Sequence, residues 1–446
     1  MGSAAASGPL GWLTFCYVSL LLIGGGGGSP APLSELFCQI LAAVVLVVWV
    51  GMRGLQAITD QRVLPWVAVL LLLVPLAQLV PLPPSLWHAL PGRDLMRESL
   101  ALVGAEDLWR PISIAPQRTL DGVLALIPPL LAMAMAASLT AAERQTLLRA
   151  IGAVALLSVT VGAGQMAAGE KGPLHFYVGS DPGVPAGFQA NRNAQVDVLL
   201  IGLLALVAAW HDRAGRDRAA MIALGALALL LLLGAFLTGS RTGIALAPLV
   251  LVWCVVLVRG ELFSRASLFK LRNLLLAGAA GIGLAVAAWP TRAVQQVLLR
   301  FNLSGEYRSD IWRDTLYAIG QYWPMGSGLG TFTRAIAPAE RLEAISPVLP
   351  NRAHNEYLEV LLEGGLPLAL AWAAAGALFL LALIRALRGL TTVPRAQAIF
   401  AAGTAMIVVL HALVDYPFRS IALATLVGVA AALVLAPPTK PGNLKS

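Results

Sequence analysis

The segment His354-Asn355-Glu356-Tyr357-Leu358-Glu359 carries the side chains of this chain that are best suited to proton transfer. An imidazole has an ordinary pKa of about 6.5, so His354 can accept a proton from a hydroxyl group at neutral pH. Glu356 and Glu359 follow directly before a hydrophobic segment, where ionisable side chains are costly and usually have a function. We therefore take His354 and Glu356 as candidate catalytic residues, although a lone histidine is as readily structural as catalytic.

Five arginines are candidates for binding a diphosphate. A guanidinium group stays charged and forms paired hydrogen bonds to phosphate oxygens. Taken singly, each could equally anchor the chain at a membrane surface or form a salt bridge within a loop. Arg241 and Arg419 stand out because each lies in a very short turn on the side of the membrane that is expected to carry few basic residues. The candidate set is Arg192, Arg241, Arg308, Arg352 and Arg419, with Trp312 and Tyr357 as further loop residues of the site.

Several common catalytic signatures are missing from the sequence. It holds no Asp-x-Asp or Glu-x-Asp pair of the kind that chelates a divalent metal, no P-loop, no Rossmann fingerprint and no zinc-ligand spacing. The three cysteines, Cys16, Cys38 and Cys254, lie singly within apolar runs and are interpreted as packing residues. We therefore expect no metal and no cofactor, and a reaction whose energy comes from the substrate itself.

The composition indicates a membrane protein. Of the 446 residues, 58% are hydrophobic and 12% are charged, whereas soluble domains carry about 25% charged residues. The net charge of +8 does not indicate nucleic-acid binding, because the basic residues stand singly between hydrophobic segments rather than in a stripe. The charge fits instead the excess of lysine and arginine in the cytoplasmic loops of membrane proteins.

Twelve hydrophobic segments are candidates for membrane-spanning helices, each of which needs about 20 apolar residues. They lie near residues 11–23, 34–51, 63–80, 119–139, 150–168, 194–210, 219–237, 242–258, 273–289, 364–384, 396–414 and 420–436. We predict an all-α, multi-pass membrane protein that forms a single domain over residues 1–446. The run Gly364-Gly365-Leu366-Pro367 predicts a bend in the tenth segment.

The positions of arginine and lysine predict the orientation of these helices. With the N-terminus in the cytoplasm and alternating spans, the short loops rich in basic residues, such as 213–218, all lie in the cytoplasm. The long loops 81–118, 169–193 and 290–363 then all lie on the periplasmic side. We expect the last of them, between spans nine and ten, to carry the active site on short helices, because long loops usually have a function.

Two segments of these long loops are predicted to be helical. Residues 84–103 place leucines and Trp87 among charged residues, which suits a short helix on the membrane surface. Residues 306–323 carry Trp312, Leu316, Ile319 and Trp323 at spacings of four, three and four. This spacing predicts one apolar helical face that docks on the bundle or on lipid headgroups.

The chain resembles the O-antigen ligase and polymerase superfamily in several segments, which follow one another in the order of the family. These segments are Phe188-Gln189-Ala190-Asn191-Arg192-Asn193, Gly239-Ser240-Arg241-Thr242-Gly243, Arg308-x-x-x-Trp312, Pro324-Met325-Gly326-Ser327-Gly328-Leu329-Gly330-Thr331-Phe332, and His354–Glu359 leading to Gly364–Pro367. The resemblance covers about residues 188 to 420, whereas the N-terminal third matches only in hydropathy.

This resemblance implies a metal-independent, inverting glycosyltransferase with a GT-C-like fold in the bacterial inner membrane, its active site facing the periplasm. The donor would be a glycan on undecaprenyl diphosphate. In the family, the histidine matched by His354 is the proposed base, and arginines matched by Arg192, Arg241 and Arg308 are expected to hold the carrier diphosphate. Arg419 is our own addition to that set.

The acceptor is left open by the sequence. A polymerase would extend a growing O-antigen or exopolysaccharide, with a chain-length regulator as a possible partner, whereas a ligase would modify lipid A–core or a protein. The turn Asp415–Arg419 resembles the polymerases slightly more. A transporter or flippase for the lipid-linked glycan is the main alternative, but it should carry ionisable residues at mid-bilayer and internal repeats, and neither is evident. A non-catalytic scaffold would not explain a polar external loop joined to arginine-bearing turns.

Overall fold

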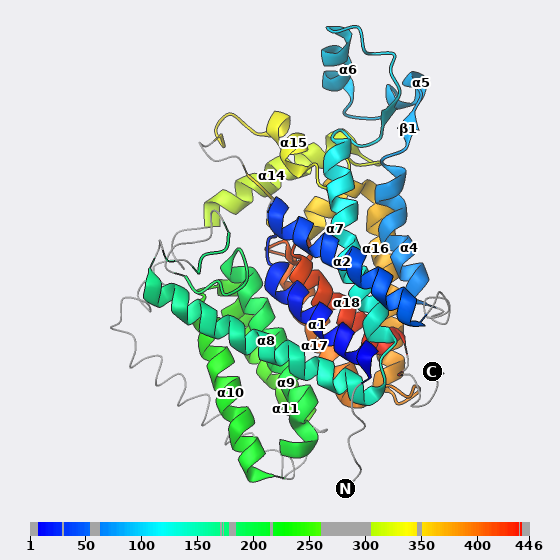
Figure 1. The fold of residues 1–446 in the computed structure, drawn as a ribbon. Coiled ribbons are helices and arrows are strands. Elements are labelled where there is room, and N and C mark those ends of the chain that lie inside the picture. Colours follow the sequence, from blue (N-terminus) through cyan, green and yellow to red (C-terminus); the bar gives the residue numbers. More distant parts are fainter. Residues whose placement is uncertain are drawn as a thin grey trace.

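The computed structural model describes residues 8–28, 31–53, 63–169, 172, 174–177, 184–214, 217–259, 305–345, 350–436 and 438. The part of the chain that it describes is almost entirely helical (Figure 1). The predicted span 273–289 and the first residues of the predicted loop 290–363 lie outside the described residues.

The other eleven predicted hydrophobic segments coincide with helices. These are α1 (Pro9–Gly24), α2 (Pro32–Arg53), α4 (Leu64–Ala77), α7 (Pro116–Ala137), α8 (Ala141–Ala168), α9 (Arg192–Ala214), α10 (Arg218–Leu237), α11 (Arg241–Arg259), α16 (Glu356–Leu387), α17 (Arg395–His411) and α18 (Ile421–Leu435). Within the described residues, 7 of them are long and apolar enough to cross a membrane, and α1, α4, α17 and α18 are apolar but shorter. The fold is therefore that of an all-α membrane protein, whereas the count of twelve spans stays a prediction.

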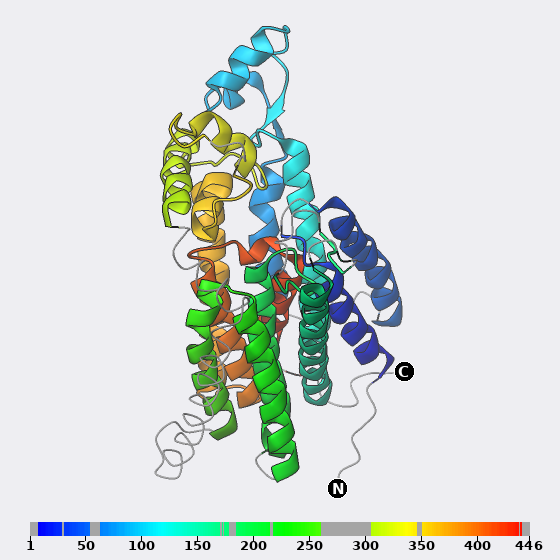
Figure 2. The ribbon, with the colours of Figure 1, turned by 90° about the vertical axis from the view of Figure 1, so that its left-hand side faces the viewer.

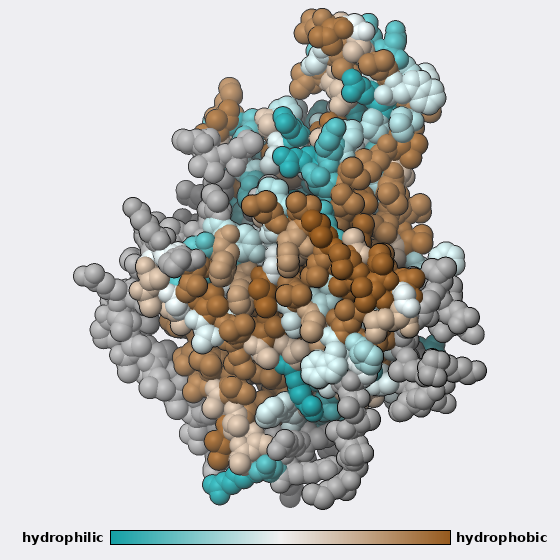
Figure 3. All heavy atoms as spheres, viewed as in Figure 1, coloured by the Kyte–Doolittle hydropathy of each residue, from teal (hydrophilic) through white to brown (hydrophobic). Residues whose placement is uncertain are grey.

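The helices form a bundle with two sides. In Figure 1, α8 to α11 lie on one side, α2, α4, α7 and α16 lie on the other, and α1, α17 and α18 lie between them. Glycines allow close packing of α8 on α9, since a Cβ atom on Gly202 would lie 2.2 Å from Cβ of Ala155. In a membrane the hydrophobic effect does not drive helices together, and small residues favour their association by letting the two backbones pack closely. Figure 3 shows hydrophobic side chains over much of the face of the bundle that it presents.

The connections that carry the predicted periplasmic loops meet at one end of the bundle, which we call the outer end. Residues 25–28 contact the segment before α9 and the start of α18. Ala190 N donates to Gly26 O at 2.8 Å, and Ala422 N donates to Gly25 O at 2.9 Å. Gln78, at the end of α4, contacts α16 and the segment before α7. Its side-chain Nε2 donates to Glu363 O at 2.8 Å, and its backbone carbonyl accepts from Ser113 N at 3.0 Å. Segments far apart in sequence therefore build one continuous polar surface.

Residues 78–115 form an excursion that projects from the outer end (Figures 1 and 2). It contains β1 (Pro81–Leu82), α5 (Pro84–Trp87), α6 (Asp94–Ala101) and β2 (Arg110–Pro111), and its two strands pair antiparallel. The single helix predicted over 84–103 was wrong. The chain turns at Gly92, whose φ of +70° favours glycine, and this turn separates α5 from α6.

The helix α14 (Gly305–Tyr322), the short α15 (Phe332–Ile336) and the 3-10 turn η2 (Ala337–Ala339) also lie at the outer end (Figure 1). The buried face of α14 carries Ile311, Ala318 and Tyr322 rather than the predicted face. Leu316 and Trp323 of the predicted face stay exposed, at 58% and 44%. Trp312 and Ile319 of that face are partly buried, and Ile319 packs against the buried stripe. The predicted face therefore docks only in part, and contact with lipid headgroups stays a prediction.

Candidate active site

His354 lies in a tight turn just before α16. Its φ of +49° is in the left-handed region, which is unfavourable for a residue with a side chain, so its contacts must hold it there. The next residue, Asn355, caps α16 by accepting hydrogen bonds from Tyr357 N and Leu358 N, both at 3.1 Å. Glu356 N donates to Ala412 O at 2.9 Å. The turn is thus held by the helix that it starts and by the end of α17.

Asp415 is the partner of the His354 side chain. His354 Nδ1 lies 3.3 Å from Asp415 Oδ1, and the ring of Tyr416 is 5.1 Å from the imidazole. Burial alone would raise the pKa of Asp415, but its hydrogen bond with His354 and the nearby His411 lower it below its usual value. Asp415 is therefore a carboxylate that accepts a hydrogen bond from Nδ1–H, which leaves Nε2 as the basic atom of His354.

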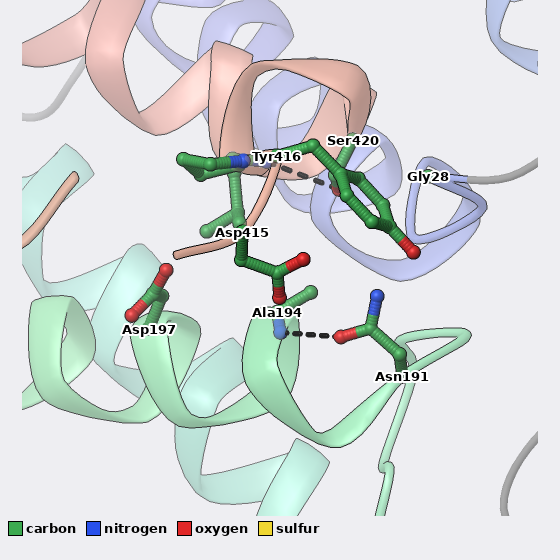
Figure 4. Close-up of a pocket in the computed structure, with 9 residues that line it drawn as sticks. Gly28, Asn191, Ala194, Asp197, Asp415, Tyr416 and Ser420 are labelled. Carbon is green, nitrogen blue, oxygen red and sulfur yellow. Dashed lines mark hydrogen bonds between the residues drawn. The ribbon is translucent and has the colours of Figure 1, made fainter. Parts of the chain in front are cut away.

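A small polar pocket lies behind Asp415 (Figure 4). Its volume of about 10 Å³ has room for about one water molecule. Asp197 also faces it and pairs with His411, whose Nδ1 is 2.7 Å from Asp197 Oδ1, and both side chains are 1% exposed. The pocket is too small for a substrate group, so these residues support Asp415 rather than contact substrate.

Three glutamates form one buried face at the start of α16. Glu356, Glu359 and Glu363 are each 0% exposed, and their spacing of three and four residues places them on the same side of the helix. Arg419, in the 3-10 turn η3 (Pro417–Arg419), reaches all of them. It donates from Nε to Glu356 at 2.8 Å and from Nη1 to Glu363 at 2.7 Å, and its Nη2 lies 3.5 Å from Glu359.

Arg352 completes this group, which we call the glutamate cluster: Arg352, Glu356, Glu359, Glu363 and Arg419. Arg352 Nη1 donates to Glu359 Oε1 at 2.7 Å. Burial alone would lower the pKa of Arg419, but the glutamate carboxylates raise it well above its usual value. Both arginines are thus held by carboxylates of the protein, and Glu356 contacts Arg419 rather than His354.

The predicted bend lies directly beyond the glutamate cluster and is confirmed. Gly365 has φ +58° and ψ −157°, which interrupts α16. A Cβ atom there would lie 2.1 Å from Pro324 O, so only glycine allows the glycine-rich loop 324–332 to cross the bend. Ser327 N and Gly328 N donate to carbonyls of α16 at 2.9 and 2.8 Å. These backbone amides are therefore bonded to α16 and are not available to a ligand. The bonds hold the loop, and the loop fixes the position of α15.

A large cavity opens beside the glutamate cluster, between α2, α4, α7, α16, α17 and α18. Its volume is about 1530 Å³. Along α16 its lining extends from Glu356 to Phe379, a distance of roughly 35 Å at the rise of an α-helix, which matches the hydrocarbon thickness of a bilayer of about 30 Å. Most of the lining is apolar, while its outer end carries charged and amide side chains. These are Glu35, Gln39, Arg118, Asp121, Arg334, Asn351, Arg352, Glu356 and Arg419.

The structure divides the predicted arginines into two groups. Arg352 and Arg419 line the cavity, as do Glu356 and Tyr357, whose hydroxyl donates to Val409 O at 2.9 Å. The other group, Arg192, Arg241 and Arg308, lies at the beginnings of α9, α11 and α14 and outside the cavity lining.

Arg308 and the neighbour of Arg192 lie close to the residues that support His354. Asn193, next to Arg192, forms a hydrogen bond with Asp415, and the charge of Arg308 acts on His411. Trp312 anchors α14 to the His354 turn by donating from Nε1 to Ala353 O at 2.9 Å. The His354 turn is therefore joined to α14, and 24% of the His354 side chain is exposed.

Sequence reasoning missed three residues of this site. Asp415 was named only as part of the turn that resembles the polymerases and was not predicted as a site residue. An acidic side chain in a short external turn could have indicated a role in the site. Arg118 and Arg334 line the cavity, and each had a cue in the sequence. Arg118 directly precedes a predicted span, and Arg334 follows the glycine-rich run of the family motif. Among the described residues, no group of three or more His, Cys, Asp or Glu side chains is placed to hold a metal ion.

Comparison with protein families identifies the central part of the chain. Residues 226–373, from α10 to the middle of α16, match the family model described as O-antigen ligase. Over these residues the match confirms the resemblance to the O-antigen ligase and polymerase superfamily. The matched region includes His354 and the three glutamates, while Asp415 and Arg419 lie beyond it. No curated protein matches the chain.

This similarity to the O-antigen ligase family fits the fold described above. Together with the apolar helices, it indicates a glycosyltransferase-like enzyme that is a multi-pass membrane protein. The predicted recognition of this superfamily is confirmed. The alternative of a flippase is not favoured by this finding.

Proposed function

We propose that the protein transfers a glycan from undecaprenyl diphosphate to a sugar hydroxyl at the periplasmic face of the bacterial inner membrane. The observation that carries the proposal is the bilayer-length apolar cavity, whose polar end adjoins the turn that holds His354 on Asp415. An isoprenoid chain suits the apolar part, since burying it there removes apolar surface from contact with polar groups. The diphosphate and the first sugar would then lie at the outer end, near His354.

The reaction follows from the chemistry of His354. Nε2 accepts the proton of the acceptor hydroxyl, and the oxygen attacks the anomeric carbon of the donor sugar. The bond from this carbon to the diphosphate oxygen breaks, and its electron pair leaves with the carrier diphosphate, whose charge arginines stabilise. One displacement inverts the anomeric centre. His354 then loses its proton to water at its exposed edge, and no metal or cofactor takes part.

The arginines outside the cavity retain a proposed role from the resemblance. Arg192, Arg241 and Arg308 would approach the diphosphate or its sugar from the side of α9, and the charge of Arg308 already reaches the polar residues behind His354. Arg352 would approach from the cavity side, because its guanidinium is bound to Glu359 through Nη1 alone. Glu356 is proposed to shape the site through Arg419 rather than to take a proton.

The orientation is tested by labelling single cysteines. Cys16, Cys38 and Cys254 are first replaced by alanine, and Glu343→Cys then marks the outer end while Arg388→Cys marks the opposite end. We expect an impermeant maleimide to label Glu343→Cys in intact spheroplasts and Arg388→Cys only after lysis, because the basic short loops belong in the cytoplasm. The reverse pattern would place the site in the cytoplasm and contradict the proposal.

Deletion of the gene tests the function in cells. For a polymerase, which we favour, we expect long glycan chains to disappear while single repeat units persist on the carrier or on lipid A–core. For a ligase we expect full-length chains to accumulate on undecaprenyl diphosphate while lipid A–core stays bare. Lipid extracts analysed by mass spectrometry separate the two outcomes. Accumulation of the donor on the cytoplasmic side alone would indicate a flippase and would refute both forms of the transferase.

A further inference from the structure

Arg118 and Arg334, at the polar end of the cavity, differ from the other arginines there in having no carboxylate partner. Neither has a carboxylate within 4.0 Å among the described residues, whereas Arg352 and Arg419 are bound to buried glutamates. Both line the cavity, Arg118 from the first turn of α7 and Arg334 from α15. Asp121 lines it too, one turn along α7, but it forms no ion pair with either arginine.

The segments that carry these two arginines are joined to each other. Thr119 Oγ1 donates to Leu329 O at 2.9 Å, and Ile114 N donates to Ser327 O at 2.9 Å. A Cβ atom on Gly330 would lie 2.7 Å from the carbonyl oxygen of Arg118. The beginning of α7 and the loop into α15 therefore form one rim, and both guanidinium groups extend from neighbouring points on it.

We infer that Arg118 and Arg334 bind the diphosphate of the carrier lipid, an inference that rests on the proposed function. A guanidinium group cannot lose its proton and matches phosphate oxygens with two parallel hydrogen bonds. Two such groups at the rim of an apolar cavity, without a carboxylate of their own, suit an anion attached to a long apolar chain. Arg419 has the opposite arrangement, because three buried glutamates surround its guanidinium and two of them accept from its Nε and Nη1, so it stabilises the protein rather than the substrate.

The test measures binding of undecaprenyl diphosphate to the full-length protein in nanodiscs of phosphatidylcholine. The variant is Arg118→Gln/Arg334→Gln, and the matched control is Arg97→Gln/Arg388→Gln, which makes the same change of charge at two exposed arginines away from the cavity. We expect the affinity of the variant to fall roughly 25-fold, from two charge-assisted contacts of about fivefold each. The control should bind within about twofold of the unchanged protein, the scatter expected of surface substitutions.

The outcomes separate this inference from the proposed function. If the unchanged protein binds undecaprenyl diphosphate and the variant binds it equally well, the assignment of Arg118 and Arg334 is overturned while the proposed function stands. If the unchanged protein binds none, the proposed function itself fails. Addition of phosphatidylglycerol provides the third arm: competition at equal affinity would show that the two arginines only hold bilayer headgroups, and this too would overturn the inference.

Discussion

Replacing His354 by asparagine is expected to lower the rate of glycan transfer by about 10²- to 10⁴-fold, the usual contribution of a positioned general base. Donor binding should be nearly unchanged, because a base acts mainly in the transition state. Asparagine is the informative substitution, since it tolerates the left-handed backbone that His354 adopts at φ +49° better than alanine does. Its amide can also donate to Asp415, so the turn should stay in place.

The effect is measured as single-turnover release of undecaprenyl diphosphate, together with the affinity for the donor. His88→Asn is the matched control, because His88 lies in the excursion, outside the cavity lining, where its Nε2 is 3.0 Å from Glu106 O. This control should turn over at nearly the rate of the unchanged protein. A folded His354→Asn protein with near-normal turnover would remove His354 from the mechanism.

Replacing Arg419 by glutamine is expected to destabilise the protein by about 3–5 kcal/mol, the usual cost of removing one partner from a buried ion pair. The side chain is 11% exposed, and its loss would leave Glu356 and Glu363 buried without their cation. Thermal unfolding in detergent measures the loss. The reason is structural, so the effect should appear in the absence of any substrate.

A second variant separates a structural role of Arg419 from a substrate-binding role. Arg419→Gln combined with Glu356→Gln and Glu363→Gln removes the uncompensated charges as well, so part of the lost stability should return, as expected for coupled residues. Our account would be wrong about Arg419 if the single variant unfolded like the unchanged protein and lost only its affinity for undecaprenyl diphosphate. In that case Arg419 would bind the diphosphate.

The helices of this fold could be predicted because a membrane imposes simple rules on sequence. Backbone groups in a bilayer must bond within their own helix, so long apolar runs such as 219–237 coincide closely with helices such as α10. The excursion after α4 was harder to predict. There the chain leaves the apolar bundle, and the turn at Gly92, rather than the apolar pattern, decides where each short helix ends.

The site could be predicted in its residues but not in their pairing. The spacing of Glu356, Glu359 and Glu363 shows that they share one helix face, yet nothing local reveals that Arg419, more than fifty residues later, reaches all three. The partner of His354 is likewise distant, since Asp415 follows the next helix, α17. Ion pairs between segments depend on how the helices pack, and hydropathy carries no information about that.

The most direct test of the central claim is transfer by the purified protein in liposomes that contain undecaprenyl diphosphate carrying defined repeat units. We predict release of undecaprenyl diphosphate with formation of a glycosidic bond of inverted anomeric configuration, either to a second carrier-linked glycan or to lipid A–core. Excess EDTA should leave the rate unchanged. Absence of any undecaprenyl diphosphate release with both acceptors, or a product in which the anomeric configuration is retained, would contradict transfer by direct displacement at His354.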